Sequence, residues 1–264
     1  MTVLIKYPFQ TKERNSIFFE KKDLELTNLD WAKWAGWYDT DGCFDFQAKT
    51  GKKRVVLPLK DRQPVELFSK TFEASLCYRT YKTITPEPYR YEYQAEVHAS
   101  GLNGAKAVWF TKNVFPYLVR QEKKDYAARL LGYRPESKDL TTWTTDEVIY
   151  YLATAMEGDG FVRCSSRRGT TSLALETELK SSDVQYLSDV KSIADNKLGV
   201  RSTLSKRATY KTLKGIRTKY GLYILCSRKN PNNLGFFQSL VKDNVMTLDR
   251  KKQKVQEFLG GMPR

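Results

Sequence analysis

Two acids that follow matching apolar runs are the residues best suited to chemistry. Asp41 ends the run 34–42 and Asp159 ends the run 152–160, each just before a glycine. Carboxylate oxygens are the ligands that Mg²⁺ prefers, and they need no help from histidine or cysteine. Two copies of such an element in one chain indicate a pseudo-twofold site, which could hold cations and act on a twofold partner such as duplex DNA.

Charge and length narrow the class of partner. The chain has 264 residues and a formal net charge of +15, which is enough chain for two domains with cores of their own. An excess of positive charge of this size indicates a polyanionic partner. An anionic membrane is the alternative, but no apolar run approaches the roughly 20 residues of a membrane-spanning helix.

The cysteine and histidine content argues against zinc and against histidine-dependent catalysis. The 4 cysteines are widely scattered, and His98 is the single histidine. Structural zinc sites need closely spaced Cys and His ligands. We therefore expect free thiols in a reducing intracellular compartment, organellar or microbial, and no secretory signal at the N-terminus. Any chemistry falls to carboxylates, lysines and metal ions.

Capping signals predict a helix before each acid. Thr27-Asn28 precedes a predicted helix over 29–38, and Thr144 with Glu147 has capping-box spacing before a helix over 145–156. We expect Gly42 and Gly160 to end these helices and to allow a sharp exit into a strand.

Alternating polarity after each glycine predicts two strands per unit. The expected inward positions are Phe44, Phe46, Ala48, Val55, Leu57 and Leu59 in the first unit, and Val162, Cys164, Leu173, Leu175 and Leu179 in the second. The expected outward positions of the second unit include Arg163, Arg167, Glu176, Glu178 and Lys180.

The remaining pattern repeats in the same order and predicts an α+β fold. Helices are expected over 65–76 and 183–198, strands over 77–84, 90–98, 200–210 and 216–226, and helices at the end of each unit. The order α-β-β-α-β-β-α-α thus occurs twice. We divide the chain into an extension of unknown role (1–26), a first unit (27–132), a linker (133–143) and a second unit (144–264).

A basic, tyrosine-rich stretch marks the second unit. No acid lies between Asp195 and Asp243, and Arg217, Lys219 and Tyr223 share one strand face. A solvated surface is the alternative reading, but a strand face of this kind suits phosphate neutralisation and base reading in the major groove. The candidate DNA-binding residues are Gln47, Lys49, Arg54, Lys60, Gln94, Arg163, Arg167, Lys180, Arg201, Arg207, Arg217, Lys219 and Tyr223.

The two acid-bearing runs resemble the signature of the LAGLIDADG homing endonucleases. The first copy matches at Ala35, Gly36, Asp39, Asp41 and Gly42, and the second at Leu152, Ala153, Asp159 and Gly160, with Glu157 as a conservative change. Thr154 replaces a glycine of the signature, so we expect a slightly wider helix contact there. The resemblance covers residues 27 to about 259 and is to the single-chain, two-motif branch.

The resemblance implies two pseudo-twofold-related αββαββα units, each with a saddle-forming antiparallel sheet and with the signature helices packed at the interface. It implies that Asp41 and Asp159 bind divalent metal, with backbone carbonyls from Thr40 and Gly158. It also implies structural roles for Asp39 and Glu157. The expected cofactor is Mg²⁺, as two or three ions, with Mn²⁺ substituting and Ca²⁺ supporting binding without cleavage.

The family also places a lysine at the start of the late helix and a polar residue late in the second strand. Lys123 and Lys251 match the lysine and are the further catalytic candidates, with Lys124 and Lys252 as one-residue alternatives. Lys60 matches the strand position by parity in the first unit, whereas Glu178 or Lys180 matches in the second.

The implied activity is that of a monomeric, intron-encoded endonuclease that cuts both strands of a long DNA site and leaves short 3′ overhangs. Two alternatives share the fold: a maturase that binds the host intron RNA, and a catalytically silent DNA-binding protein. Retention of both acids favours the nuclease.

Overall fold

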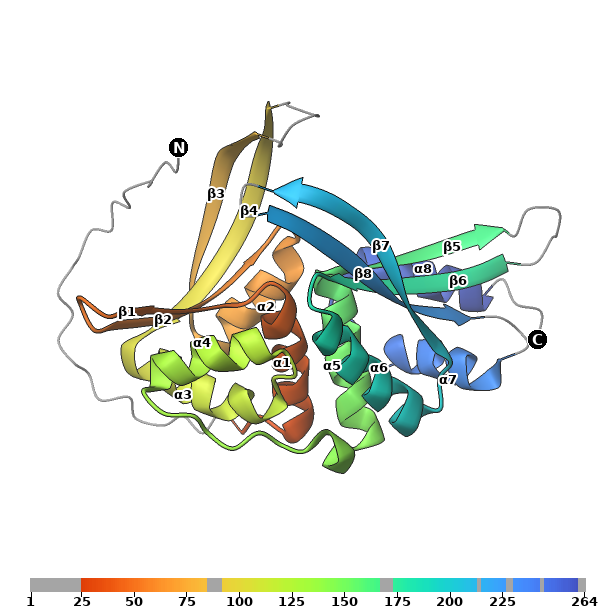
Figure 1. Cartoon of the computed structure of the whole chain (residues 1–264), viewed down its shortest axis with the longest axis horizontal. Helices are drawn as coiled ribbons and strands as arrows, with labels where there is room; N and C mark the ends of the chain where they lie inside the picture. Colours follow the sequence, from red (N-terminus) through yellow and green to blue (C-terminus); the bar gives the residue numbers. More distant parts are fainter. Residues whose placement is uncertain are drawn as a thin grey trace.

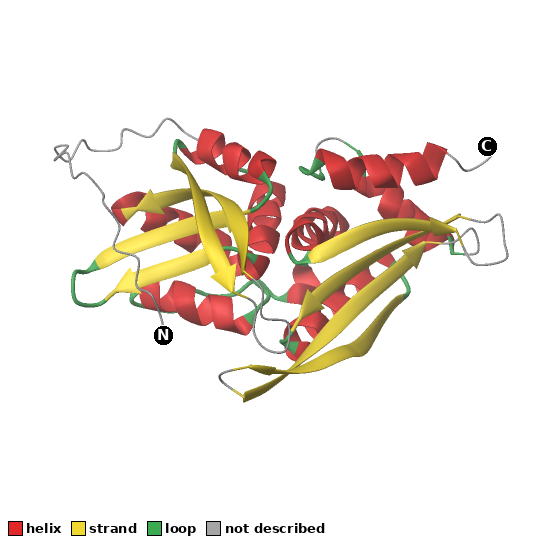
Figure 2. Ribbon diagram, turned by 90° about the horizontal axis from the view of Figure 1, so that it is seen from above, coloured by secondary structure: helices red, strands yellow, loops and turns green. Residues whose placement is uncertain are grey.

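The computed structural model describes residues 25–84, 92–166, 173–212, 215–226, 230–242 and 245–260. Its sheets form one layer and its helices the layer beneath them, with α1 (Asn28–Thr40) and α5 (Thr145–Gly158) side by side at the centre (Figure 1). Seen from above, the sheets of the two units lie next to each other over the helices (Figure 2).

The predicted double order of elements is confirmed. After α1, the first unit contains β1 (Cys43–Gln47), β2 (Lys52–Leu59), α2 (Arg62–Phe72), β3 (Ser75–Ile84), β4 (Glu92–Asn103), α3 (Gly104–Val114), the 3-10 turn η1 (Phe115–Tyr117) and α4 (Gln121–Leu131). A second 3-10 turn, η2 (Leu140–Thr142), precedes the second unit. That unit begins with α5 and continues with β5 (Gly160–Ser166), β6 (Leu173–Ser181), α6 (Val184–Leu198), β7 (Ser202–Thr212), β8 (Gly215–Cys226), α7 (Pro231–Leu240) and α8 (Asp249–Gly260).

Both central helices begin at a capping box. Thr27 and Asp30 form one at α1, and Thr144 and Glu147 form the predicted one at α5. The least accurate helix prediction is 65–76, because α2 ends at Phe72. Glu73 caps that helix in the left-handed conformation, with φ 48°, and the sequence has no glycine there to mark the stop.

Each unit has one antiparallel four-stranded sheet, in the orders β1-β2-β4-β3 and β5-β6-β8-β7. The predicted inward face is largely correct, since Val55, Leu57, Leu175 and Leu179 are fully buried against the helices. Two inward predictions are wrong: Phe46 is 41% exposed, and Ala48 lies in the turn after β1. The cause is that β1 is a short strand at the sheet edge. We call the sheet face turned away from the helices the outer face.

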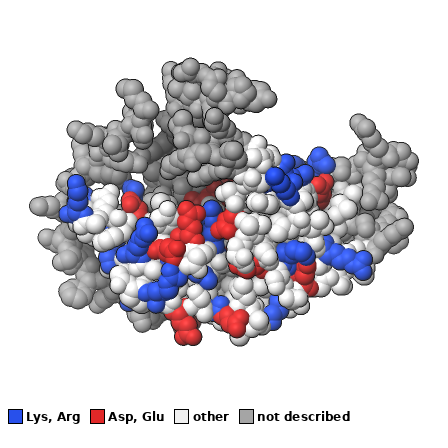
Figure 3. Space-filling model, viewed as in Figure 1, with Lys and Arg blue, Asp and Glu red and all other residues white. Residues whose placement is uncertain are grey.

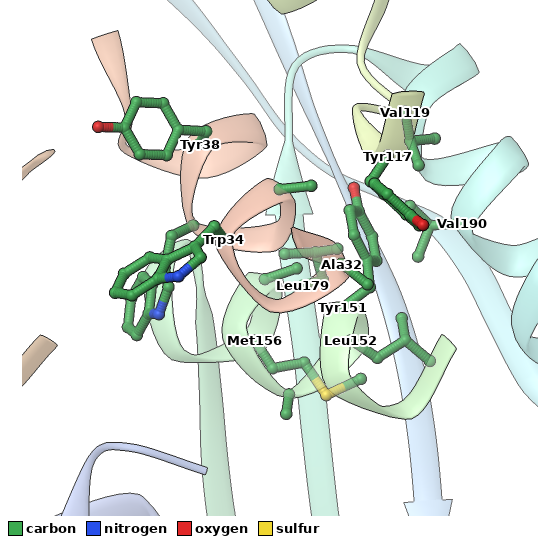
Figure 4. Close-up of a cluster of buried hydrophobic side chains, with 14 of the residues drawn as sticks. Ala32, Trp34, Tyr38, Tyr117, Val119, Tyr151, Leu152, Met156, Leu179 and Val190 are labelled. Atoms are coloured by element: carbon green, nitrogen blue, oxygen red, sulfur yellow. The ribbon is translucent and has the colours of Figure 1, made fainter. Parts of the chain in front are cut away.

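The signature helices pack directly against each other. A Cβ added to Gly36 of α1 would overlap the Thr154 hydroxyl and the Tyr151 carbonyl of α5. Thr154, the expected departure from the signature, donates its hydroxyl hydrogen bond across the interface to the Lys33 carbonyl at 2.7 Å. Figure 4 shows Trp34 and Tyr38 on one side of α1, well away from Tyr151 of α5.

An aromatic cluster fixes α1 in the first unit. The rings of Trp34 and Phe68 lie 5.3 Å apart, and those of Tyr38 and Phe110 lie 4.8 Å apart. Such ring contacts stabilise the fold beyond the hydrophobic burial of the rings.

In the part of the chain that the structure describes, no helix is long and apolar enough to cross a bilayer.

Candidate active site

The two signature acids lie where the paired helices end. Asp41 caps α1, with its backbone N–H donating to the Trp37 carbonyl at 2.9 Å, and Asp159 caps α5. A Cβ on Gly158 would lie 2.5 Å from Asp41 Oδ2 and would overlap the Thr40 hydroxyl. The helix ends are therefore so close that a side chain at position 158 would have to displace those of Thr40 and Asp41, and the two acids are brought together.

Burial and mutual repulsion leave negative charge poorly compensated here. Burial, and then the nearby Asp159 carboxylate, raise the pKa of Asp41 to about 6. Burial also raises the pKa of Asp159, against the opposing charges of Arg120 and Lys123. Both acids face the negative ends of helix dipoles. Within the described residues, the buried Asp41 Oδ2 has no hydrogen-bond partner.

The acid two residues before each signature acid ties down a later helix. Asp39 accepts from the backbone N–H of Val119 at 2.7 Å and of Arg120 at 3.2 Å, just before α4. Glu157 accepts from the backbone N–H of Thr247 and Leu248, both at 2.6 Å, just before α8. These contacts agree with the structural roles expected for Asp39 and Glu157, because helix N-termini leave such donors unsatisfied.

The two candidate lysines lie on those late helices, α4 and α8, and their side chains contact the backbone next to the signature acids. Lys123 Nζ donates to the Gly42 carbonyl at 2.5 Å. Lys251 Nζ donates to the carbonyls of Met156, Glu157 and Gly160 at 2.7–2.8 Å. The positions of Lys123 and Lys251 are equivalent in the two units.

Burial lowers the pKa of both lysines, that of Lys251 to about 8. Among the described hydrogen bonds, none joins the alternatives Lys124 and Lys252 to these loops. The contacts of Lys251 are those of a positioning residue, since its three donors bind backbone carbonyls.

Arg120 is a cation at this centre that the sequence analysis missed. Its guanidinium pairs with Glu122 at 2.9 Å and approaches Asp183 of the second unit at 3.8 Å. Among the neighbouring positive charges, that of Arg120 has the largest effect in lowering the pKa of Asp159. The repeat comparison could not find it, because its equivalent in the second unit is Leu248.

The oxygen atoms at this centre suit a hard cation that is held partly by the protein and partly by water or phosphate oxygens. No group of three or more His, Cys, Asp or Glu side chains suited to a metal ion occurs among the residues that the structure describes. Mg²⁺, however, is commonly held by one or two carboxylates, with waters and substrate phosphates completing its shell. The paired acids and the unsatisfied Asp41 Oδ2 provide such a partial set.

Most predicted DNA-binding residues that the structure describes are exposed. Gln47, Lys49, Lys60, Arg163, Lys180, Arg201, Arg207 and Lys219 are exposed, whereas Arg54 and Tyr223 are half-buried. Arg54 pairs with Asp45 at 3.1 Å. Arg167 and the side chains of Gln94 and Arg217 lie outside the described part of the chain. On the face shown in Figure 3, acids and bases are mixed over the helices in the lower half.

Strand register corrects the match between Lys60 and the second unit. Cys43 pairs with Val56 and Phe161 pairs with Glu178, and both Cys43 and Phe161 directly follow a signature glycine. Val56 therefore corresponds to Glu178, and Pro58 corresponds to Lys180. Lys60 lies beyond the end of β2 and is not equivalent to either candidate.

Glu178 lies on the outward strand face, as predicted, but its side chain is fully buried rather than exposed to solvent. Arg207 and Lys180 cover it on the outer face of β6.

Comparisons with known proteins identify the fold. No protein-family model and no curated protein matches the chain. Among solved structures, it is similar to the LAGLIDADG homing endonuclease I-GzeII in complex with its DNA target, at 11% identity and a TM-score of 0.51, over 87% of this chain and 88% of that one. It is also similar to the homing endonuclease I-WcaI bound to its DNA recognition sequence, at 13% identity and a TM-score of 0.48, over 91% of this chain and 95% of that one. The chain therefore has the two-unit fold of the LAGLIDADG homing endonucleases.

Proposed function

We propose that this chain is a site-specific endonuclease that binds a long duplex DNA target and hydrolyses both strands with a divalent cation. The observation that carries the proposal is the meeting of Asp41 and Asp159 at the paired ends of α1 and α5. Burial disfavours the ionised form of both acids, and the nearby Asp159 carboxylate disfavours that of Asp41 further; a cation bound between them would offset both effects.

Charge and fold support DNA as the substrate. The net charge of +15 favours a polyanion, and exposed basic side chains such as Arg163, Lys180 and Lys219 lie on the outer face of the second sheet. Phosphate contacts from such residues supply most of the sequence-independent affinity for DNA. The similar I-GzeII structure is itself a complex with a DNA target.

The residues of the centre divide into cation-binding and positioning groups. Asp41 and Asp159 would hold the cation, with the backbone carbonyls of Thr40 and Gly158 as additional donors. When bound, the cation would lower the pKa of an attacking water and stabilise the leaving 3′ oxygen. Lys123 and Lys251 fix the loops that carry the acids. A single chain carries both acids, so we propose that it acts as a monomer. We also propose that it leaves short 3′ overhangs, as the resemblance to the family implies.

Selection followed by cleavage tests this function. The chain is first used to select targets from a randomised duplex library in Ca²⁺, and the selected sequence is cloned into a supercoiled plasmid. We expect linear plasmid in Mg²⁺ or Mn²⁺ and none in EDTA. Specific binding without cleavage in either metal would identify a catalytically silent DNA-binding protein. Failure to select DNA, together with tight binding of structured intron RNA, would identify a maturase.

A further inference from the structure

The outer face of the second sheet holds a cluster built around a buried carboxylate. The Glu178 side chain on β6 is fully buried, although its strand face points away from the helices. Arg207 Nε on β7 donates to Glu178 Oε1 at 2.6 Å, and Lys180 Nζ lies 3.5 Å from Glu178 Oε2. Three strands contribute to the cluster, because the Arg207 guanidinium also lies over the Tyr223 ring of β8, 4.1 Å from its centre.

Backbone features of this sheet are adapted to the cluster. The register of β7 and β8 shifts between Lys206 and Ala208, so Arg207 is the extra residue of a β-bulge. Bulges re-aim the side chain that they carry. A Cβ on Gly221 of β8 would overlap Glu178 Oε1, so a glycine at this position makes room for the carboxylate.

The arrangement fixes the guanidinium and leaves its outer edge available. Only Nε of Arg207 has a hydrogen bond among the described residues, and the side chain remains 43% exposed. The guanidinium is planar, so an ion pair at Nε and a stacked ring together set its orientation. The first unit has Val56 and Gly101 at the positions of Glu178 and Tyr223, so this cluster belongs to the second unit alone.

We propose that Arg207 reads a guanine in the major groove, and that Glu178 and Tyr223 are the residues that position it. This inference rests on the proposed function. An oriented guanidinium edge matches the O6 and N7 acceptors of guanine, which form the commonest specific contact of arginine with DNA. A phosphate would also accept two hydrogen bonds, but a contact with phosphate carries no base preference.

The position of the cluster on β6 indicates how far the proposed guanine lies from the cleavage centre. The Lys180 backbone N–H donates to the Asp159 carbonyl at 3.4 Å, and Glu178 lies two residues earlier on the same strand. Strands rise about 3.3 Å per residue, and each base pair adds about 3.4 Å. The guanine therefore lies within the first few base pairs from the cleavage centre, in the half-site that the second unit covers.

Base preference in a binding selection tests the inference without cleavage. The wild-type chain, Arg207→Lys, Glu178→Gln and Arg62→Lys each select from a randomised duplex library in Ca²⁺, with thermal melting to confirm folding. Arg62 is the matched control, because its Nε also donates to a glutamate, Glu66 Oε1 at 2.7 Å, but on helix α2. Lysine keeps the charge at position 207 and removes the planar fork.

We expect Arg207→Lys to reduce the preference for guanine about tenfold or more at one inner position of one half-site. Glu178→Gln should weaken the same position, and Arg62→Lys should leave the whole profile unchanged. An unchanged profile for Arg207→Lys would overturn this inference alone and would favour a phosphate contact. If the wild-type chain selects no sequence, the proposed function fails, and this inference fails with it.

Discussion

Replacing Lys251 by methionine should destabilise the protein more than the same change at Lys123. The two lysines occupy equivalent places in the repeats, but their hydrogen bonds differ. Lys251 is 3% exposed and donates to three carbonyls, those of Met156 and Glu157 in the last turn of α5 and that of Gly160, where β5 begins. Lys123 is half-buried and donates to one carbonyl, that of Gly42. Methionine keeps much of the side-chain volume and removes every donor.

The size of the effect follows from those contacts. A hydrogen bond to a charged group contributes about 1.5–3 kcal/mol, and breaking a buried charged network costs about 3–5 kcal/mol. We therefore expect a loss of about 3–5 kcal/mol for Lys251→Met and about 1.5–3 kcal/mol for Lys123→Met. At about 2–4 °C per kcal/mol, the Tm of Lys251→Met should be several degrees lower than that of Lys123→Met.

Thermal and urea unfolding of the two variants beside the wild type measure the difference. Single-turnover cleavage of bound DNA by the same variants should also slow, because both lysines hold the loops that carry the acids. Equal stabilities, or a larger loss for Lys123→Met, would refute the claim that the three hydrogen bonds of Lys251 stabilise the end of α5 more than the single bond of Lys123 stabilises its loop. A variant that loses stability but cuts at the wild-type rate would refute its positioning role.

Three further predictions concern pH, salt and packing. Burial raises the pKa of Glu157 to about 7, so its contribution to stability is complete below its ordinary pKa and is lost as pH rises through about 7. The unfolding free energy should therefore fall by about 3 kcal/mol from this group between pH 5 and 8, and Glu157→Gln should unfold with a flatter pH profile; parallel profiles would contradict this. DNA affinity should fall roughly a thousandfold between 50 and 200 mM salt if about six or more phosphates are contacted. A salt-independent Kd from gel-shift titrations would contradict the proposal that basic side chains on the outer face bind DNA phosphates. Gly36→Ala should lower stability by about 1–3 kcal/mol, because its Cβ would overlap α5. The control Gly235→Ala has open space around its Cβ and should be neutral or stabilising, and equal Tm values for the two would contradict the close packing of α1 and α5.

Local signals were sufficient to predict most of the fold. The capping box at Thr144 and Glu147 located the start of α5, and period-two alternation located the inward face of β2 and β6. Both are properties of neighbouring residues. The predicted correspondence of Lys123 and Lys251 depended only on counting back from the apolar pairs of the late helices, and the structure places both lysines at equivalent loops.

The errors arose where contacts between distant residues decide the outcome. The burial of Glu178 depends on a bulge in β7 and a glycine in β8, neither of which alters the pattern of β6. The assignment of Lys60 to the family's polar position in the second strand was wrong, because alternation along a strand predicts which face a residue occupies but not which residue it pairs with. Arg120 has no counterpart in the second unit, so a comparison of repeats could not indicate it.

Cleavage by Asp41→Asn and Asp159→Asn tests the central claim most directly. Each variant is bound to the selected target in Ca²⁺, transferred to Mg²⁺, and followed for linear plasmid at saturating protein. The change removes one charge from a carboxylate at the cation site and leaves the DNA-facing strands intact. We predict that both variants bind the target with affinity close to that of the wild type and form no linear product. Cutting of both strands at near the wild-type rate by either variant would contradict the assignment of these acids as the cation-binding centre.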